Sequence, residues 1–386
     1  MIHSCNHKLR QEIHHALASR ARVLVALFAI LPAAGHPDTP LGWIYNNNPA
    51  AYTLPAQSLE ANLGALAVND TLDFLDIRED LLAGNQRLVG DSGNLSGAEL
   101  DLSYGIQDWL TLSFSRRNQS LTVDLGEINS VNLVDIDNSL DSSLESLGLK
   151  WRFFEGGLLN DESRRSAAAL EISMFRSKSD PFDVVLDQIN LDNLTVFFRD
   201  PQTFSVTDLE DDGWQARLLY TTPLEQLGIG TVWLGIGETD ASSATTSDVP
   251  TVSVARVFEQ QFNLEESYLY LGVSLDVQLT PRIPLTLSYQ YIDVTDSFIK
   301  QFPENPSSAL PGFLRPSSGL AEDSNHLFQA RLSYWITPEL NLGIRGNLYS
   351  NQFLGEIPHF NNPLSGSFAS QPYGFAGVEL GYKFAF

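Results

Sequence analysis

The sequence predicts an all-β protein, folded as one closed antiparallel transmembrane β-barrel of about twelve strands. Extended segments recur in which apolar and polar side chains alternate, and this is the period of a strand with one apolar face. Most have roughly the ten residues that a tilted strand needs to cross a bilayer. Their connections are alternately short and long, which is the asymmetry typical of transmembrane barrels. The longest apolar run, Val23 to Ala34, has 12 residues, too few to cross a bilayer as a helix.

The first 35 residues have the layout of a secretory signal peptide. Basic residues precede the apolar run, and the run ends in the small residues Pro32-Ala33-Ala34-Gly35. A basic region, an apolar core and a small-residue exit together predict cleavage near Ala34 or Gly35. The single cysteine, Cys5, lies before this core. The mature chain is therefore expected to contain no disulfide.

Residues 36–56 are rich in proline, which argues against regular structure. We interpret them as a periplasmic lead-in, with the alternative that they fold into the mouth of the barrel. The residues Asn48-Pro49-Ala50-Ala51 within this segment resemble the Asn-Pro-Ala of the long-chain fatty-acid transporters of the outer membrane.

Residues 57–386 are assigned to the barrel. The predicted strands are centred on residues 59–65, 98–104, 110–114, 147–153, 168–174, 214–220, 232–236, 269–277, 285–291, 328–334, 340–344 and 376–386. The long segments near 68–95, 118–143, 177–211, 238–266, 293–325 and 351–372 are expected to be loops at one end of the barrel. The short turns, such as Ile336-Thr337-Pro338-Glu339, would lie at the other end.

The last strand carries a more specific signal. Alternate residues back from Phe386 are all apolar or aromatic, and the residues between them are small or charged. This ending resembles the C-terminal strand of bacterial outer-membrane β-barrels, in which a terminal phenylalanine is recognised by the assembly machinery. The resemblance implies the cell outer membrane of a Gram-negative bacterium as the location, and the barrel assembly machinery as a partner of the Phe386 strand.

The net charge of the chain limits the kinds of partner that it can bind. The formal net charge is -24, and it becomes -27 when residues 1–35 are removed, because they hold four bases and one acid (23 − 4 = 19 bases, 47 − 1 = 46 acids). Such a balance argues against nucleic acid as a partner. It fits an acidic surface that faces cations or cation-bridged lipopolysaccharide, so the expected partners are outer-membrane lipid and lipopolysaccharide.

The polar faces of the predicted strands supply the candidate site. Their charged residues are nearly balanced in sign, and they would line a polar lumen and pair across strands. The twelve candidates are Glu60, Glu99, Asp101, Lys150, Arg152, Glu171, Arg217, Asp276, Arg331, Arg345, Glu379 and Lys383. We expect Lys150 and Arg152 to face Glu171, and Lys383 to lie near Glu60. The same charges would also suit a plugged barrel that does not conduct.

Neither a cofactor nor a catalytic residue is assigned. Zinc spacings, phosphate loops and dinucleotide fingerprints are missing from the sequence. Acidic runs at residues 70–80, 135–145 and 208–212 could hold calcium or magnesium, but solvated loops are the preferred interpretation. His326 follows Asp323 and Ser324 closely, which keeps a barrel hydrolase as a third hypothesis.

The sequence therefore predicts a non-enzymatic outer-membrane channel for passage of a small solute. The alternative is a non-conducting structural or surface-binding barrel.

Overall fold

The computed structural model describes residues 49–68, 94–122, 139–156, 166–191, 194–224, 227–247, 261–302, 324–350 and 373–385. These contain the strands β1 (Ser58–Val68), β2 (Asn94–Gln107), β3 (Leu110–Thr122), β4 (Ser139–Gly156), β5 (Ser166–Ser179), β6 (Phe182–Leu191), β7 (Leu194–Pro223), β8 (Ile229–Ser247), β9 (Gln261–Thr280), β10 (Ile283–Phe302), β11 (Ser324–Trp335), β12 (Leu340–Tyr349) and β13 (Tyr373–Ala385). Within these ranges, no helix has the length and apolar character needed to cross a membrane.

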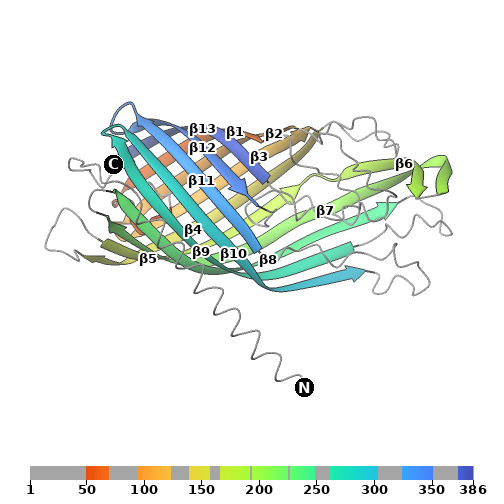
Figure 1. Ribbon diagram of the computed structural model, residues 1–386, viewed down its shortest axis with the longest axis horizontal. Coiled ribbons are helices and arrows are strands. Elements are labelled where there is room, and N and C mark those ends of the chain that lie inside the picture. Colours follow the sequence, from red (N-terminus) through yellow and green to blue (C-terminus); the bar gives the residue numbers. More distant parts are fainter. Residues whose placement is uncertain are drawn as a thin grey trace, which may run out of the picture.

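Twelve of the strands close into a ring (Figure 1). Each strand of the ring pairs antiparallel with its neighbours in sequence, β1 pairs with β13, and β5 pairs with β7. The remaining strand, β6, pairs with the first part of β7 outside the ring. The prediction of a closed antiparallel barrel of about twelve strands is therefore confirmed.

An apolar belt surrounds the barrel. Large hydrophobic side chains of every strand in the ring point outward, and many are about half exposed, among them Leu63, Leu147, Leu234, Ile344 and Val378. Polar and charged side chains are buried on the inner face. This is the reverse of a soluble sandwich, and it suits a wall that faces lipid outside and a polar lumen inside.

Charged side chains replace apolar ones at one level of the outer face and mark the upper limit of the belt. The outward residues at this level are Arg116, Glu145, Arg176, Asp212, Glu238, Glu265 and Asp293. Several pair with the next strand, as in Arg116–Glu145 at 3.1 Å and Arg176–Asp212 at 3.5 Å. Charges cost several kcal/mol in lipid, so the strands above this level lie outside the membrane.

Above the belt, β7 to β10 continue as a sheet extension that β6 joins, and this part projects beyond the ring (Figure 1). The sequence interpretation of 177–211, 238–266 and 293–325 as loops was therefore wrong for residues 182–191, 194–211, 238–247, 261–266 and 293–302. The alternation used to find strands comes from the contact with lipid. Strands above the belt have no such contact. They remain paired with their neighbouring strands, although their outer face carries polar residues.

Two carboxylates meet inside this extension. Asp211 is completely buried on β7 and accepts a hydrogen bond from the Thr239 hydroxyl on β8. Glu266 on β9 is directly opposite Thr239 and is also buried. Burial, and then the charge of Asp211, raise the pKa of Glu266 from 4.5 to about 7.

We expect Glu266→Gln to stabilise the protein at pH 8.5 and to change little at pH 4. Because the folded-state pKa is raised, Glu266 supports the fold while protonated, and this support is lost as the pH rises from about 4.5 through 7. The shift corresponds to about 3 kcal/mol. The measurement is the thermal unfolding midpoint of both proteins at the two pH values. A constant difference across this range would show that Glu266 does not titrate there.

Candidate functional site

The structure places all twelve candidate residues on the inner face of the barrel wall. Glu60, Glu99, Lys150, Asp276 and Glu379 are less than 10% exposed, and the other seven are partly buried. They come from nine different strands, and the strand register makes direct neighbours of some of them, such as Glu171, which lies opposite both Lys150 and Arg217. A further inward charge, Arg117 on β3, was missed because it lies at the end of the predicted alternation.

One group of charges is centred on Glu171 of β5. Its carboxylate accepts two hydrogen bonds from Arg217 on β7, at 3.0 and 2.6 Å, and contacts Lys150 Nζ on β4 at 3.4 Å. The predicted contact of Lys150 with Glu171 is confirmed. Arg152 is different, because it lies opposite Ala169 near the rim and bonds Glu155 at 2.9 Å and the Asp108 carbonyl at 2.8 Å.

A second group of charges extends around the barrel wall from β11 to β2. Arg331 on β11 bonds Glu379 on β13, and Arg345 on β12 bonds Glu99 on β2. Glu99 also contacts Arg117 at 3.4 Å. Lys383 is opposite Glu60 in the β1–β13 register, as expected.

Glycines on the inner face make these long contacts possible. A β-carbon on Gly343 would lie 2.5 Å from a carboxylate oxygen of Glu379, which is too close for atoms that are not bonded. On the two strands that separate Arg345 from Glu99, Gly377 is directly opposite Arg345 and Gly64 is directly opposite Glu99. The charged side chains therefore extend along the wall over neighbouring positions that are glycine.

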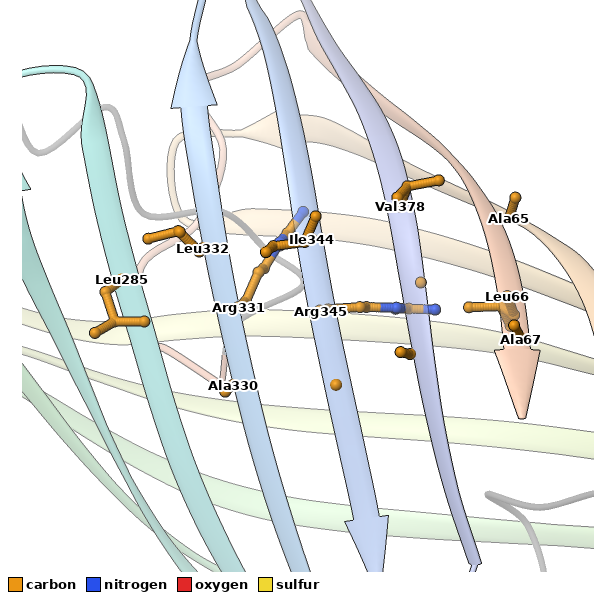
Figure 2. A pocket seen from close by; sticks show the side chains of 13 residues that line it. Ala65, Leu66, Ala67, Leu285, Ala330, Arg331, Leu332, Ile344, Arg345 and Val378 are labelled. Atoms are coloured by element: carbon orange, nitrogen blue, oxygen red, sulfur yellow. The ribbon is translucent and has the colours of Figure 1, made fainter. Parts of the chain in front are cut away.

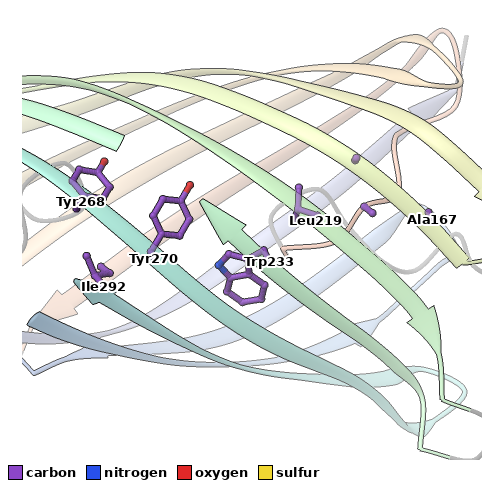
Figure 3. Close-up of a cluster of buried hydrophobic side chains, with 8 residues drawn as sticks. Ala167, Leu219, Trp233, Tyr268, Tyr270 and Ile292 are labelled. Carbon is purple, nitrogen blue, oxygen red and sulfur yellow. The ribbon is translucent and has the colours of Figure 1, made fainter. Parts of the chain in front are cut away.

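The inner face of β8 and β9 carries three large aromatic side chains and follows the same rule. Trp233 lies over Gly272, Tyr270 over Gly235 and Tyr268 over Gly237, where an added β-carbon would clash with the ring. Figure 3 shows these three rings along the inner wall with Leu219 and Ile292. We call this set the aromatic wall. The signal that would have revealed it is Gly235-x-Gly237 on one strand facing Tyr268-x-Tyr270 on the next.

Residues 49–57, here called the strap, cross the mouth at the end of the barrel that has the short turns. Ser274 Oγ on β9 donates to the Pro49 carbonyl at 3.4 Å, and the Ala51 N–H donates to Thr221 Oγ1 on β7 at 2.7 Å. At the other end, the Leu54 N–H donates to Thr111 Oγ1 at 2.9 Å, and the Gln57 N–H donates to the Gly105 carbonyl on β2 at 2.8 Å.

The strap follows a diameter of the barrel. β2 and β9 are six strands apart in either direction around the ring of twelve. Ala51 is completely buried within the aromatic wall, and Tyr52 packs against it. Burial, and then Glu155, raise the pKa of the Tyr52 hydroxyl above its usual value. This part of the lead-in therefore lies inside the mouth, as in the alternative interpretation, and residues 1–48 lie outside the described residues.

Two hollows lie on opposite sides of the same stretch of wall. The outer one measures about 650 Å³ and is apolar, and Figure 2 shows Leu285 and Leu332 at one side of it and Ala65 and Ala67 at the other. The inner one, of about 50 Å³, is lined by Pro49, Thr286, Ser288, Gln329, Ala330, Arg331, Arg345 and Asn347. Ala330, Arg331 and Arg345 are common to both.

His326, the candidate for a hydrolase, points away from the lumen. Its neighbours Asn325 and Leu327 are buried on the inner face, whereas the His326 ring lies among outward aromatic residues. The Nδ1 atom is 2.8 Å from the Tyr289 hydroxyl. This environment resembles an interfacial aromatic cluster more than a nucleophile–base pair.

The acidic runs give no metal centre in the described residues, which contain no group of three or more His, Cys, Asp or Glu placed to hold an ion. Glu210 from the third run instead bonds Lys178 at 2.6 Å and Arg176 at 2.9 Å. The runs at 70–80 and 135–138 lie outside the described residues.

Comparisons with known proteins find likenesses to solved structures but none by sequence. No family model and no curated protein sequence matches it. A crystallised outer membrane channel from Pseudomonas putida F1 is 12% identical with a TM-score of 0.41, covering 86% of this chain and 98% of that chain. The translocator domain of the autotransporter NalP from Neisseria meningitidis is 9% identical with a TM-score of 0.44, covering 85% and 88%.

The outer membrane protease OmpT from Escherichia coli is 9% identical with a TM-score of 0.34, covering 87% of this chain and 100% of that chain. Likenesses of this size do not decide between a channel, a translocator and a protease. The class follows from the chain's own structure. A closed antiparallel ring with an apolar outer belt, a polar interior and short turns at one end is a transmembrane β-barrel of the outer-membrane type.

Proposed function

We propose that the protein is a channel of the Gram-negative outer membrane through which a small solute passes along the lumen. The observation that carries this proposal is the inner wall, where charged groups pair along the surface rather than across the centre. Burying an ion pair costs several kcal/mol per charge, and an apolar filling of equal volume would hold a purely structural barrel at least as well. Retaining so many charges is best explained by a polar path.

The strap is the element that would have to move. It crosses the mouth along a diameter and is held to the wall by a small number of hydrogen bonds, two of which use the threonine hydroxyls of Thr111 and Thr221. A hydrogen bond of this kind contributes about 1 kcal/mol. Thermal motion or a solute could therefore displace the strap without unfolding the barrel.

We expect the double variant Thr111→Val, Thr221→Val to open the channel more often. Removing two hydrogen bonds that hold the strap should raise the open fraction about tenfold or more. The measurement is single-channel conductance in planar bilayers, on protein whose folding is verified by heat-modifiable gel mobility.

Thr295→Val is the matched control, because the Thr295 hydroxyl bonds the Ser267 carbonyl above the apolar belt, at 3.0 Å, far from the strap. It should conduct as the wild type does. Protein that folds but stays silent in all three forms would contradict the channel and favour a plugged barrel.

The sheet extension supports a second candidate, a barrel that binds a partner at its surface. In this extension, β6 to β10 form a folded surface above the level at which the outer face becomes charged. If transport is the function, channel activity should persist when a bound antibody fragment covers the sheet extension. Cell fractionation would test the outer-membrane location and export through the signal peptide.

A further inference from the structure

Arg331 and Arg345 form an unusual pair on the inner wall. They are directly opposite each other in the β11–β12 register. Like charges in directly opposed positions destabilise a sheet. Each guanidinium has a carboxylate partner, Glu379 or Glu99, but these lie on other strands. A guanidinium has five N–H donors, so one carboxylate contact leaves several of them for another ligand.

The inner hollow lies at this pair. Arg331 and Arg345 keep 11% and 16% of their side-chain surface exposed, and both contribute to its lining. Around them are the hydroxyls of Thr286 and Ser288 and the amides of Gln329 and Asn347. The volume of about 50 Å³ has room for a few water molecules or a carboxylate, but not for a whole solute.

The aromatic wall begins next to this hollow. Gln290 is two residues from Ser288 on the same face of β10, and its side-chain oxygen accepts the indole N–H of Trp233 at 2.9 Å. That bond fixes the ring against Gly272. Tyr52 of the strap already packs against this wall, so a flat ring has a surface there once the strap moves.

We propose that Arg331 and Arg345 form an anion subsite in the lumen that takes the carboxylate of a passing solute, while the aromatic wall takes its flat apolar ring. This names the solute class of the proposed channel and rests on that function for transport. Two adjacent guanidiniums match the two oxygens of a carboxylate, and strap residue Pro49 lines the same hollow.

Benzoate and its neutral analogue benzyl alcohol are the probes. Binding to the purified barrel is measured by titration calorimetry, and entry is measured in proteoliposomes. We expect benzoate to bind and enter in preference to benzyl alcohol, and Arg331→Gln or Arg345→Gln to weaken benzoate binding about tenfold. Arg331→Lys and Arg345→Lys, which keep the charge, should recover part of the binding. Benzyl alcohol should be unaffected in all four variants.

Arg116→Gln is the matched control, because Arg116 is an exposed arginine on the outer face whose carboxylate partner is Glu145. It should bind benzoate as the wild type does. Equal binding of the two probes, or equal loss of both in the glutamine variants, would overturn the subsite. If benzoate binds through the arginines but does not enter the liposomes, the subsite is retained and the channel is overturned. If both probes enter without a preference for benzoate, the channel is retained and the subsite is overturned.

Discussion

Replacing Glu171 with glutamine is expected to lower the free energy of unfolding by about 3–5 kcal/mol. The Glu171 carboxylate is the shared partner of Lys150 and Arg217. Lys150 is only 4% exposed, so the variant leaves a buried ammonium and a guanidinium beside each other without the negative charge between them. The measurement is equilibrium unfolding by urea in lipid vesicles.

Glu210 provides the matched control. It also joins two cations, Arg176 and Lys178, but these are more than half exposed and lie above the apolar belt. Exposed ion pairs contribute at most about 1 kcal/mol, so Glu210→Gln should have a small effect. Equal effects of the two substitutions would mean that water reaches the Glu171 group freely and that the lumen is wide at this level.

The ring of strands could be predicted because lipid imposes a strict pattern. Every outward residue in the belt must be apolar, so the alternation around residues such as Leu234 and Ile344 is visible in the sequence. The same argument identified which charged residues face inward. It fails above the belt, where the outer face of β8 carries Glu238 and Asp240 and the strand continues without an apolar signal.

The arrangement inside the lumen could not be predicted in the same way. Arg345 reaches Glu99 across two intervening strands, and this contact depends on the register of β12, β13, β1 and β2 together. It also depends on Gly64 and Gly377, which the alternation shows only as small inward residues. The strap was one of two alternatives for a proline-rich segment, because no periodic pattern marks a chain that is held by individual hydrogen bonds such as those to Thr111 and Thr221.

Replacing Leu234 with arginine tests what the outer face touches. Leu234 points outward on β8 and is half exposed, and its outward neighbours Val232 and Ile236 are similarly exposed. An arginine at the middle of the lipid-facing surface costs about 2–4 kcal/mol in a barrel of this type. We therefore expect the unfolding free energy in lipid vesicles to fall by that amount.

Asp240→Arg is the control on the same strand and the same face, above the level where the outer surface becomes charged. There the arginine meets water and the carboxylates of neighbouring strands, so the change should be below about 1 kcal/mol. The contrast between the two positions measures the depth of the apolar belt directly. If both substitutions were equally tolerated, the exposed leucines and isoleucines of the ring would not be facing lipid, because only a hydrocarbon surrounding distinguishes the two sites.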